Sequence, residues 1–243
     1  MHRIFFPQEL KERIEIRGSK AHKISSVLRM NKEEKLLIFD GKGKSQIMKI
    51  NEINKDSVSL YTPTNIINKS KNIPEVILAM SLIKPSRFEI AVEKTTELGV
   101  SEIYPMVTQN TNNIFHKRMN QKIIDRVRNI AISAAEQCGN DFIPKIHPPI
   151  QIEQILNLND EETKFILYYE KAKFDRKIDI KITDYKKVII LIGPEGGFTE
   201  SEYSQINQKS LVLSLGENIL RTETASICAV HEVNQLIRSY SLE

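Results

Sequence analysis

Long apolar runs are missing from this chain of 243 residues. The longest are five residues each, Val76 to Met80 and Val188 to Ile192, whereas a helix that crosses a bilayer needs roughly 20. The opening residues are followed at once by Glu9, Lys11 and Glu12, which leaves no room for the apolar core of a secretory signal. We therefore expect a cytoplasmic protein with no membrane partner.

Cysteine is equally scarce. Cys138 and Cys228 are the only two, and they lie 90 residues apart. That pattern supports neither a disulfide framework nor the paired ligands of a zinc site. We expect two buried thiols and no metal.

Disorder is excluded as the main description, because 40% of the residues are hydrophobic and the 35 Lys+Arg nearly balance the 31 Asp+Glu. The charge is unevenly distributed, however. Residues 1 to 70 hold 14 basic and 8 acidic side chains, whereas residues 71 to 243 hold 21 and 23. Such a local basic excess attracts a polyanion such as nucleic acid, although solvated surface lysines alone would give the same count.

A polar stretch, Asn65 to Asn72, separates two strand-like runs and resembles a linker. We therefore predict two domains, residues 1–70 and 71–243. In the first, short alternating runs and the turn Asp40 to Gly43 indicate a small β-barrel. One short helix interrupts it, with Ser19 as the expected N-cap and Ile24, Val27 and Leu28 on its buried face.

After residue 73 apolar strands alternate with longer helical patterns, which is the signature of a parallel sheet flanked by helices. The second domain is therefore α/β. Thr199 to Glu202 reads as a capping box. The last helix, from about Thr224 to Tyr240, is apolar over a wide arc, and we expect it to pack between the sheet and another surface such as a second subunit.

Glycine is scarce, with nine in the chain, yet Gly193, Gly196 and Gly197 cluster directly after the buried strand Lys187 to Ile192. Ligands bind at the carboxyl ends of strands in open α/β sheets, where glycine lets the backbone approach them closely. The segment is neither a Walker loop nor a dinucleotide fingerprint. A plain turn between strand and helix is the alternative.

A second loop, Leu215 to Ala225, also follows a strand and opens a helix. It combines an apolar wall with Arg221, Glu223 and two hydroxyls, a mixture suited to a flat ring beside polar chemistry. The alternative is that one threonine caps the helix while Arg221 pairs with Glu223. Four further segments accompany these two loops: Arg3 to Phe6, His22 to Arg29, Lys84 to Val100 and Ala134 to Gly139.

Together these segments resemble the bacterial 16S ribosomal RNA uridine-N3 methyltransferases, of the SPOUT class of S-adenosylmethionine-dependent enzymes. The resemblance covers nearly the whole chain. It implies a PUA-like RNA-binding β-barrel, a SPOUT-type trefoil-knotted α/β methyltransferase domain, a homodimer packed through the knots, and methylation of uridine U1498 in the small ribosomal subunit. It also implies that S-adenosylmethionine binds around nine residues: Ile192, Gly193, Glu195, Gly196, Leu215, Gly216, Asn218, Ile219 and Leu220.

The resemblance also suggests catalytic roles. Arg221 is expected to orient the uridine or its phosphate and to favour the developing N3 anion. Glu195, Glu223 and His231 are candidate proton acceptors, and the sequence does not choose between them. Contacts with RNA are expected from basic residues of both domains: Arg3, Arg17, Lys20, Lys23, Arg29, Lys84, Arg87 and Lys94.

Two positions depart from the family pattern, since Asn110 and Asn140 stand where an arginine is expected. Both changes remove positive charge that would suit RNA phosphate. Two other functions stay open: a SPOUT methyltransferase acting on another RNA, such as transfer RNA, and a non-catalytic RNA-binding dimer.

Overall fold

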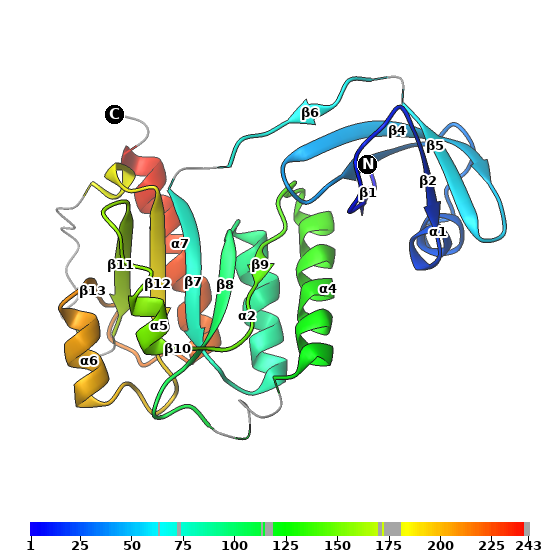
Figure 1. Cartoon of the computed structure of the whole chain (residues 1–243). Coiled ribbons are helices and arrows are strands. Elements are labelled where there is room, and N and C mark those ends of the chain that lie inside the picture. The colour runs from blue at the N-terminus through cyan, green and yellow to red at the C-terminus, as the bar shows by residue number, and fades with distance from the viewer. Residues whose placement is uncertain are drawn as a thin grey trace. The chain divides into compact units, whose positions relative to one another are not determined.

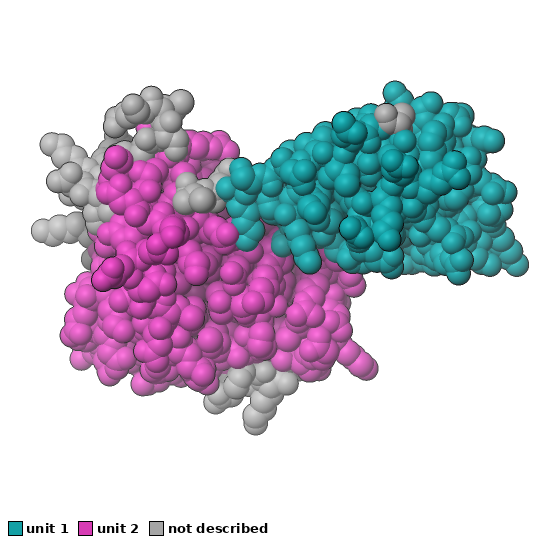
Figure 2. Space-filling model, turned by 45° about the horizontal axis from the view of Figure 1, so that its top comes forward, with its two compact units in different colours: residues 1–71, 135–143 teal, residues 72–134, 144–243 magenta. Residues whose placement is uncertain are grey.

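The computed structural model describes residues 1–62, 64–71, 74–112, 114, 119–169, 172 and 181–240. It divides into two compact units, which Figure 2 colours separately. Unit 1 comprises residues 1–71 together with 135–143, and unit 2 comprises residues 72–134 and 144–243. A segment distant in sequence therefore completes the N-terminal unit.

Unit 1 is built on an open mixed sheet of six strands in the order β1-β3-β4-β5-β2, with β6 paired to β4. β1 runs parallel to β3, and the other pairs are antiparallel. The sequence predicted the four longer strands, but β6 lies inside the stretch expected to be a linker. The strands are β1 (Arg3–Phe5), β2 (Arg13–Arg17), β3 (Lys35–Phe39), β4 (Lys44–Ile53), β5 (Ser57–Tyr61) and β6 (Ile67–Asn68).

The short helix of unit 1 differs from the prediction in two details. α1 (Ser19–His22) begins after Gly18, which occupies the N-cap position at φ 65°, and no side chain caps the helix. The chain continues as a π-helical turn, η1 (Lys23–Val27). Because a π turn holds more residues than an α turn, it shifts the helical phase. Ile24 is fully buried as predicted, whereas Val27 is 66% exposed.

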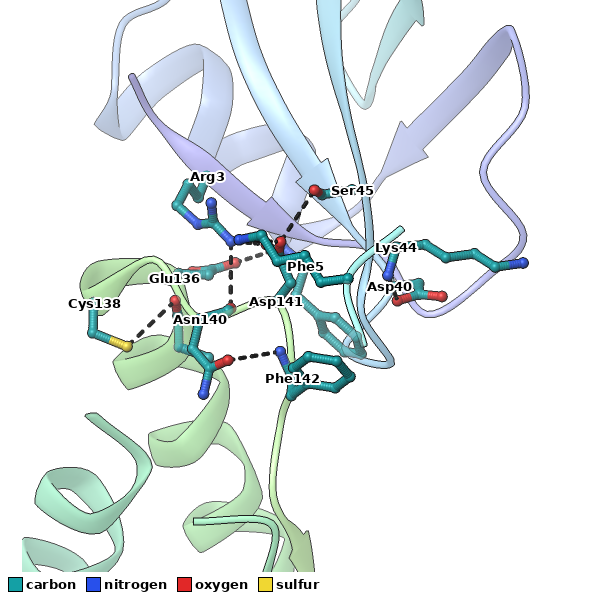
Figure 3. Close-up of polar contacts among 12 residues, drawn as sticks. Arg3, Phe5, Asp40, Lys44, Ser45, Glu136, Cys138, Asn140, Asp141 and Phe142 are labelled. Carbon is teal, nitrogen blue, oxygen red and sulfur yellow. Dashed lines mark hydrogen bonds and ion pairs between the residues drawn. The ribbon is translucent and has the colours of Figure 1, made fainter. Parts of the chain in front are cut away.

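The segment 135–143 is joined to the rest of unit 1 by Asp141, whose side chain is completely buried (Figure 3). Its carboxylate pairs with the Arg3 guanidinium and, at 2.7 Å, with Lys69 Nζ. Ser45 Oγ donates a third hydrogen bond at 3.2 Å. Glu136 accepts from the Phe5 amide at 2.9 Å and from Lys23 Nζ at 2.5 Å.

Unit 2 contains a seven-stranded sheet in the order β10-β8-β7-β12-β11-β13, with β9 paired to β8. Every pair is parallel, as the α/β prediction requires. The strands are β7 (Glu75–Ser81), β8 (Glu102–Val107), β9 (Lys145–Ile146), β10 (Ile150–Gln151), β11 (Thr163–Tyr168), β12 (Lys187–Ile192) and β13 (Ser210–Leu213).

Helices cover both faces of this sheet, which explains why β7 and β12 are continuous apolar runs. Figure 1 shows α5 on one face and α7 on the other. Residues of α5 and α6 share a buried cluster with Ile77, Phe165 and Leu191, while α7 packs on β7, β12 and α2. The helices are α2 (Pro85–Glu97), α4 (Gln121–Cys138), α5 (Ile152–Leu156), α6 (Glu200–Asn207), α7 (Thr222–Tyr240) and the 3-10 turn η2 (Ile182–Asp184).

The prediction of two buried thiols is wrong, because Cys138 and Cys228 are both free and exposed in this single chain. Cys138 is the last residue of α4, and Cys228 occupies an exposed position in α7. Within the described ranges, the helices are too short or too polar to cross a membrane.

Candidate active site

The glycine loop follows β12 at the carboxyl edge of the sheet of unit 2. The next helix, α6, begins with the predicted capping box, in which Thr199 and Glu202 exchange hydrogen bonds. A Cβ built on Gly193 would lie 2.8 Å from the Phe198 ring, so the loop requires glycine there. Asn110 Nδ2 donates to the carbonyl oxygens of Gly196 at 3.2 Å and Gly197 at 3.0 Å, which fixes the loop's outer side.

The second loop follows β13 and leads into α7. Gly216 has φ 124°, a conformation that L side chains rarely adopt, and its amide is held by Ser214 Oγ at 3.3 Å. Thr222 Oγ1 donates to the Gly193 carbonyl at 3.2 Å, which ties the second loop to the first. Thr222 therefore does not cap α7 with its hydroxyl but joins two loops that lie 29 residues apart in sequence.

These two loops enclose a cavity of about 240 Å³. Its wall combines backbone polar groups with apolar side chains, as small-molecule sites do. All nine residues predicted to hold a cofactor line this cavity: Ile192, Gly193, Glu195, Gly196, Leu215, Gly216, Asn218, Ile219 and Leu220. Ile219 lines it with a side chain that is 83% exposed.

Eight further residues line the same cavity, and the sequence analysis assigned them no such role. Pro194 and Gly197 belong to the glycine loop and Thr222 to the second loop, so motif boundaries could have included them. Tyr168 and Tyr169 come from the end of β11, and only the order of the strands brings β11 beside β12. The full set is Tyr168, Tyr169, Pro194, Gly197, Phe198, Ser214, Thr222 and Ala225.

A second cavity, of about 360 Å³, adjoins the first and shares Pro194, Glu195 and Gly196 with it. The start of α2 supplies Lys84 and Arg87, and the segment after β8 supplies Asn110 and Asn112. Leu82 and Ile83 complete its wall. The structure thus places one edge of the glycine loop between a cavity of mixed polar and apolar lining and a cavity with two cations in its wall.

Arg87 connects three segments of unit 2. Its Nη1 donates to Glu195 Oε1, and its Nε lies 3.6 Å from Glu223 Oε1. The Glu195 side chain is 61% exposed, whereas that of Glu223 is only 10% exposed. Glu223 Oε2 is buried and has no hydrogen-bond partner among the described residues.

The three predicted catalytic residues occupy different positions around these cavities. Glu195 lines both cavities, whereas Glu223 lies behind Arg87 and lines neither. Arg221 is exposed between two cavity residues, and its guanidinium has no hydrogen-bond or ion-pair partner in the described part of the chain. The alternative pairing of Arg221 with Glu223 is therefore wrong, since Glu223 pairs with Arg87. His231 is exposed farther along α7 and lines neither cavity.

The basic residues expected to contact RNA differ in their freedom to do so. The Arg3 side chain is 14% exposed and is committed to Asp141, so its availability to phosphate was overestimated. Lys20 is also engaged inside unit 1, because Nζ donates to the Phe5 carbonyl and lies 4.4 Å from the Phe5 ring centroid. Burial lowers the pKa of Lys20.

The remaining predicted contacts divide into paired and unpaired cations. Arg17 pairs with Glu15 at 2.8 Å, and Lys23 with Glu136. Lys94 bonds to two carboxylates of its own helix, and these hydrogen bonds raise its pKa. In the described ranges, only Arg29 and Lys84 of the eight are exposed without a side-chain partner.

Comparisons with known proteins agree with this geometry. A family model described as an RNA methyltransferase domain matches residues 69–234. The chain is 32% identical over 212 residues to ribosomal RNA small subunit methyltransferase E of Buchnera aphidicola, covering 86% of this chain and 82% of that one. It is 27% identical over 244 residues to the Bacillus subtilis protein of the same name, covering 95% of both.

Solved structures show the same fold. The crystal structure of ribosomal RNA small subunit methyltransferase E from Neisseria gonorrhoeae, bound to S-adenosyl methionine, has a TM-score of 0.83 and 27% identity, covering 97% of this chain and 98% of that one. A putative methyltransferase from Legionella pneumophila, in complex with the same cofactor, has a TM-score of 0.80 and 31% identity, covering 98% and 97%. The chain therefore belongs to the RNA methyltransferase family that includes ribosomal RNA small subunit methyltransferase E.

Proposed function

We propose that this protein transfers the methyl group of S-adenosylmethionine to N3 of a uridine in the 16S RNA of the small ribosomal subunit. The observation that carries the proposal is the single cavity formed by two glycine-bearing loops at the carboxyl ends of β12 and β13. Relatives of the same family are named ribosomal RNA small subunit methyltransferase E, and two structural neighbours are bound to this cofactor.

The lining of the cavity fits the cofactor. Gly193 and Gly216 keep Cβ atoms away from backbone that a ligand can approach, and Leu215, Ile219 and Leu220 offer apolar surface for a flat adenine ring. The bound cofactor would supply an electrophilic methyl group next to a cationic sulfur. The chain's own task is to place N3 in line with that methyl group and to help remove the N3 proton.

Positioning contributes much of the rate enhancement in such a transfer, up to about 7 to 11 kcal/mol for well-oriented reactants. Arg221 is exposed at the rim and carries paired donors that suit a uracil oxygen or a phosphate. Glu195 lines both cavities and is the proton acceptor that this geometry favours over Glu223 and His231. A carboxylate at that position lies in the wall of the cofactor cavity on one side of the loop and in the wall of the second cavity on the other.

The trefoil knot is part of the same proposal. β13 is an edge strand, yet the chain after it returns past β11 to place α7 against β7 and α2. The hydrogen bond from Thr222 to the Gly193 carbonyl holds the two loops together, which supports this part of the proposal. A chain that threads a loop departs from the general rule against knots.

The proposal extends to a homodimer packed through the knotted domain. Ile219 and Ile90 are exposed by 83% and 48% in the single chain, and a partner surface over either side chain would remove apolar area from water. Sedimentation at micromolar concentration tests this part, with roughly twice the chain mass of 28.0 kDa expected. A stable monomer would contradict it.

Unit 1 is proposed to be a PUA-like RNA-binding barrel, supported by its mixed sheet and by the basic excess of residues 1–70. Location in the cytoplasm, where ribosomal subunits are found in bacteria, belongs to the same proposal. The two rival functions predict different effects on RNA methylation.

Mass mapping of RNA from cells that lack the protein separates them. Loss of one methyl group from 16S RNA supports the proposal, loss from transfer RNA supports the first rival, and no loss supports the non-catalytic dimer. Calorimetry with S-adenosylhomocysteine adds an independent test, because saturable binding is expected and its absence would contradict the enzyme.

A further inference from the structure

The second cavity contains an ion-paired arginine, Arg87, to which the methyl transfer described above assigns no role. Arg87 lies in its wall and is flanked by two carboxylates, Glu195 and Glu223. Lys84 adds an exposed cation without a carboxylate partner in the described residues. A site with two cations in its wall suits an anionic ligand.

The two carboxylates that hold Arg87 differ in how easily they can be separated from it. The Glu195 side chain is 61% exposed and that of Arg87 is 30% exposed, so water or another anion can reach the outer ion pair and replace the Glu195 carboxylate. Glu223 is 10% exposed, so separating it would leave a desolvated charge. Arg87 can therefore change its outer partner while the inner one stays in place.

We propose that the second cavity binds a backbone phosphate of the substrate RNA at Arg87, and that this phosphate takes the place of Glu195 while Glu223 holds the guanidinium in position. The proposal rests on the proposed function, since it identifies the ligand as RNA. Arg87 is a binding residue in this scheme, and Glu223 is a positioning residue that acts through it.

The exchange couples the two cavities. Glu195 belongs to the wall that they share, so a Glu195 carboxylate released from Arg87 is free to accept a proton on the cofactor side. Before RNA binds, the ion pair occupies both Arg87 and Glu195. Substrate binding thus removes an internal competitor and frees the acceptor in one step.

The test compares two variants, each of which removes one negative charge next to the Arg87 guanidinium. The two charges lie on different sides of it. Binding of a short uridine-containing RNA oligonucleotide to the full chain is measured by fluorescence anisotropy at fixed salt. Glu195→Gln should bind it about two- to fivefold more tightly, because an exposed competing ion pair is lost. Glu223→Gln should bind it more weakly, because the guanidinium loses its fixed partner. A purely electrostatic effect would strengthen both, and that outcome would overturn the proposal.

Arg87→Lys provides the third variant. It keeps the charge but loses the paired donors, so oligonucleotide affinity should fall about tenfold. Glu89→Gln is the matched control, since Glu89 lies on the same helix and pairs at 2.8 Å with Arg126 outside both cavities. Its effect should be less than twofold. If Glu223→Gln does not fold, the opposite changes in Glu195→Gln and Arg87→Lys still decide the question.

Another anion could reach Arg87, namely the carboxylate of the cofactor, and calorimetry with S-adenosylhomocysteine distinguishes the two. Unchanged cofactor affinity in Arg87→Lys with weakened RNA binding supports the proposal. Weakened cofactor affinity with unchanged RNA binding overturns it and assigns Arg87 to the cofactor. Loss of cofactor binding by the unmodified protein would instead contradict the proposed function itself.

Discussion

Arg3 and Asp141 form a buried ion pair although they lie 138 residues apart in the sequence. Lys69 and Ser45 reach the same carboxylate from two other parts of unit 1. Figure 3 shows Arg3 and Ser45 beside it. The segment after α4 is thereby held in the N-terminal unit. Asn140, which stands where the family pattern suggested arginine, contributes its carbonyl oxygen to Arg3 at 3.3 Å.

Replacing Asp141 with Asn should destabilise the protein by about 2 to 3 kcal/mol. Breaking a buried pair from one side leaves the other charge without compensation, and the Arg3 side chain is only 14% exposed. Urea denaturation measures the change. Asp125→Asn is the control, because Asp125 pairs with Arg128 at 3.4 Å with both side chains at least half exposed; it should cost less than about 0.5 kcal/mol. Equal costs for the two variants would contradict the role assigned to Asp141.

The same carboxylate predicts a pH dependence. Burial alone raises the pKa of Asp141, but hydrogen bonds from Lys69 and Arg3 outweigh it and hold the pKa below the ordinary 3.8. The stabilisation is therefore complete above the unfolded value and is lost as pH falls through the lower folded value. The difference in unfolding free energy between wild type and Asp141→Asn should be constant above about pH 5 and should shrink below about pH 3.8. A difference that grows towards acid pH would contradict this account.

Removing residues 1–70 should remove the sheet of unit 1 and also destabilise the segment 135–143. Without Arg3, Ser45 and Lys69, the buried carboxylate of Asp141 loses all three of its side-chain partners. We expect a fragment of residues 72–243 to keep hydrogen-exchange protection in β12 but to lose it in residues 135–143. Exchange measured by mass spectrometry compares the fragment with the full chain. Full protection of residues 135–143 in the fragment would show that this segment folds without unit 1.

Local patterns in the sequence predicted most of the strands and helices. The apolar runs of β7 and β12 and the capping box at Thr199 depend on neighbouring residues, so short-range reasoning reaches them. The turn η1 shows where local patterns fail to predict burial. A single π turn changes which side of the helix is buried, and Val27 is therefore exposed. Nothing within a few residues of Val27 indicates that change.

The residues of the site also differ in how far local sequence predicts them. The nine predicted cofactor-binding residues could be found from sequence because they lie in two compact loops. These loops follow β12 and β13, which are consecutive along the chain although β11 lies between them in the sheet. Arg87, Glu195 and Glu223 come together from three distant segments, so their charges show no pattern along the chain. Arg3 was expected to contact RNA as one of the basic residues of the N-terminal domain. Its buried partner, Asp141, lies too far along the chain to be recognised from sequence.

Alanine substitutions at two positions of the glycine loop should have different effects. A Cβ at Gly193 would lie 2.8 Å from Phe198, whose ring lines the cofactor cavity, whereas a Cβ at Gly196 would lie 3.5 Å from Asn110 in ordinary contact. Gly193→Ala should lower both thermal stability and S-adenosylhomocysteine affinity, the latter about tenfold, because the ring must move. Gly196→Ala should leave stability unchanged and weaken binding through the ligand's approach alone. Undiminished affinity in both variants, measured by calorimetry, would move the cofactor site elsewhere.

Arg221 allows cofactor binding to be separated from methyl transfer. Its guanidinium is exposed, lines neither cavity and has no partner in the described part of the chain, so it is free to bind the substrate. Lysine keeps the charge but cannot present paired donors in one plane. Arg221→Lys should reduce kcat by about 100-fold, the scale of removing one oriented donor from a transition state.

Cofactor affinity of Arg221→Lys, measured by calorimetry, should change less than about twofold, because no cofactor-lining atom is altered. Arg238→Lys is the control, since Arg238 is an exposed arginine near the end of α7, the helix that begins directly after Arg221, and its substitution should leave both quantities unchanged. If Arg221→Lys loses cofactor affinity in proportion to its activity, Arg221 belongs to the cofactor site and does not act on the uridine. If its activity is retained, the orientation of the uracil must come from another donor, and Lys84 is then the remaining exposed cation beside the shared wall of the two cavities.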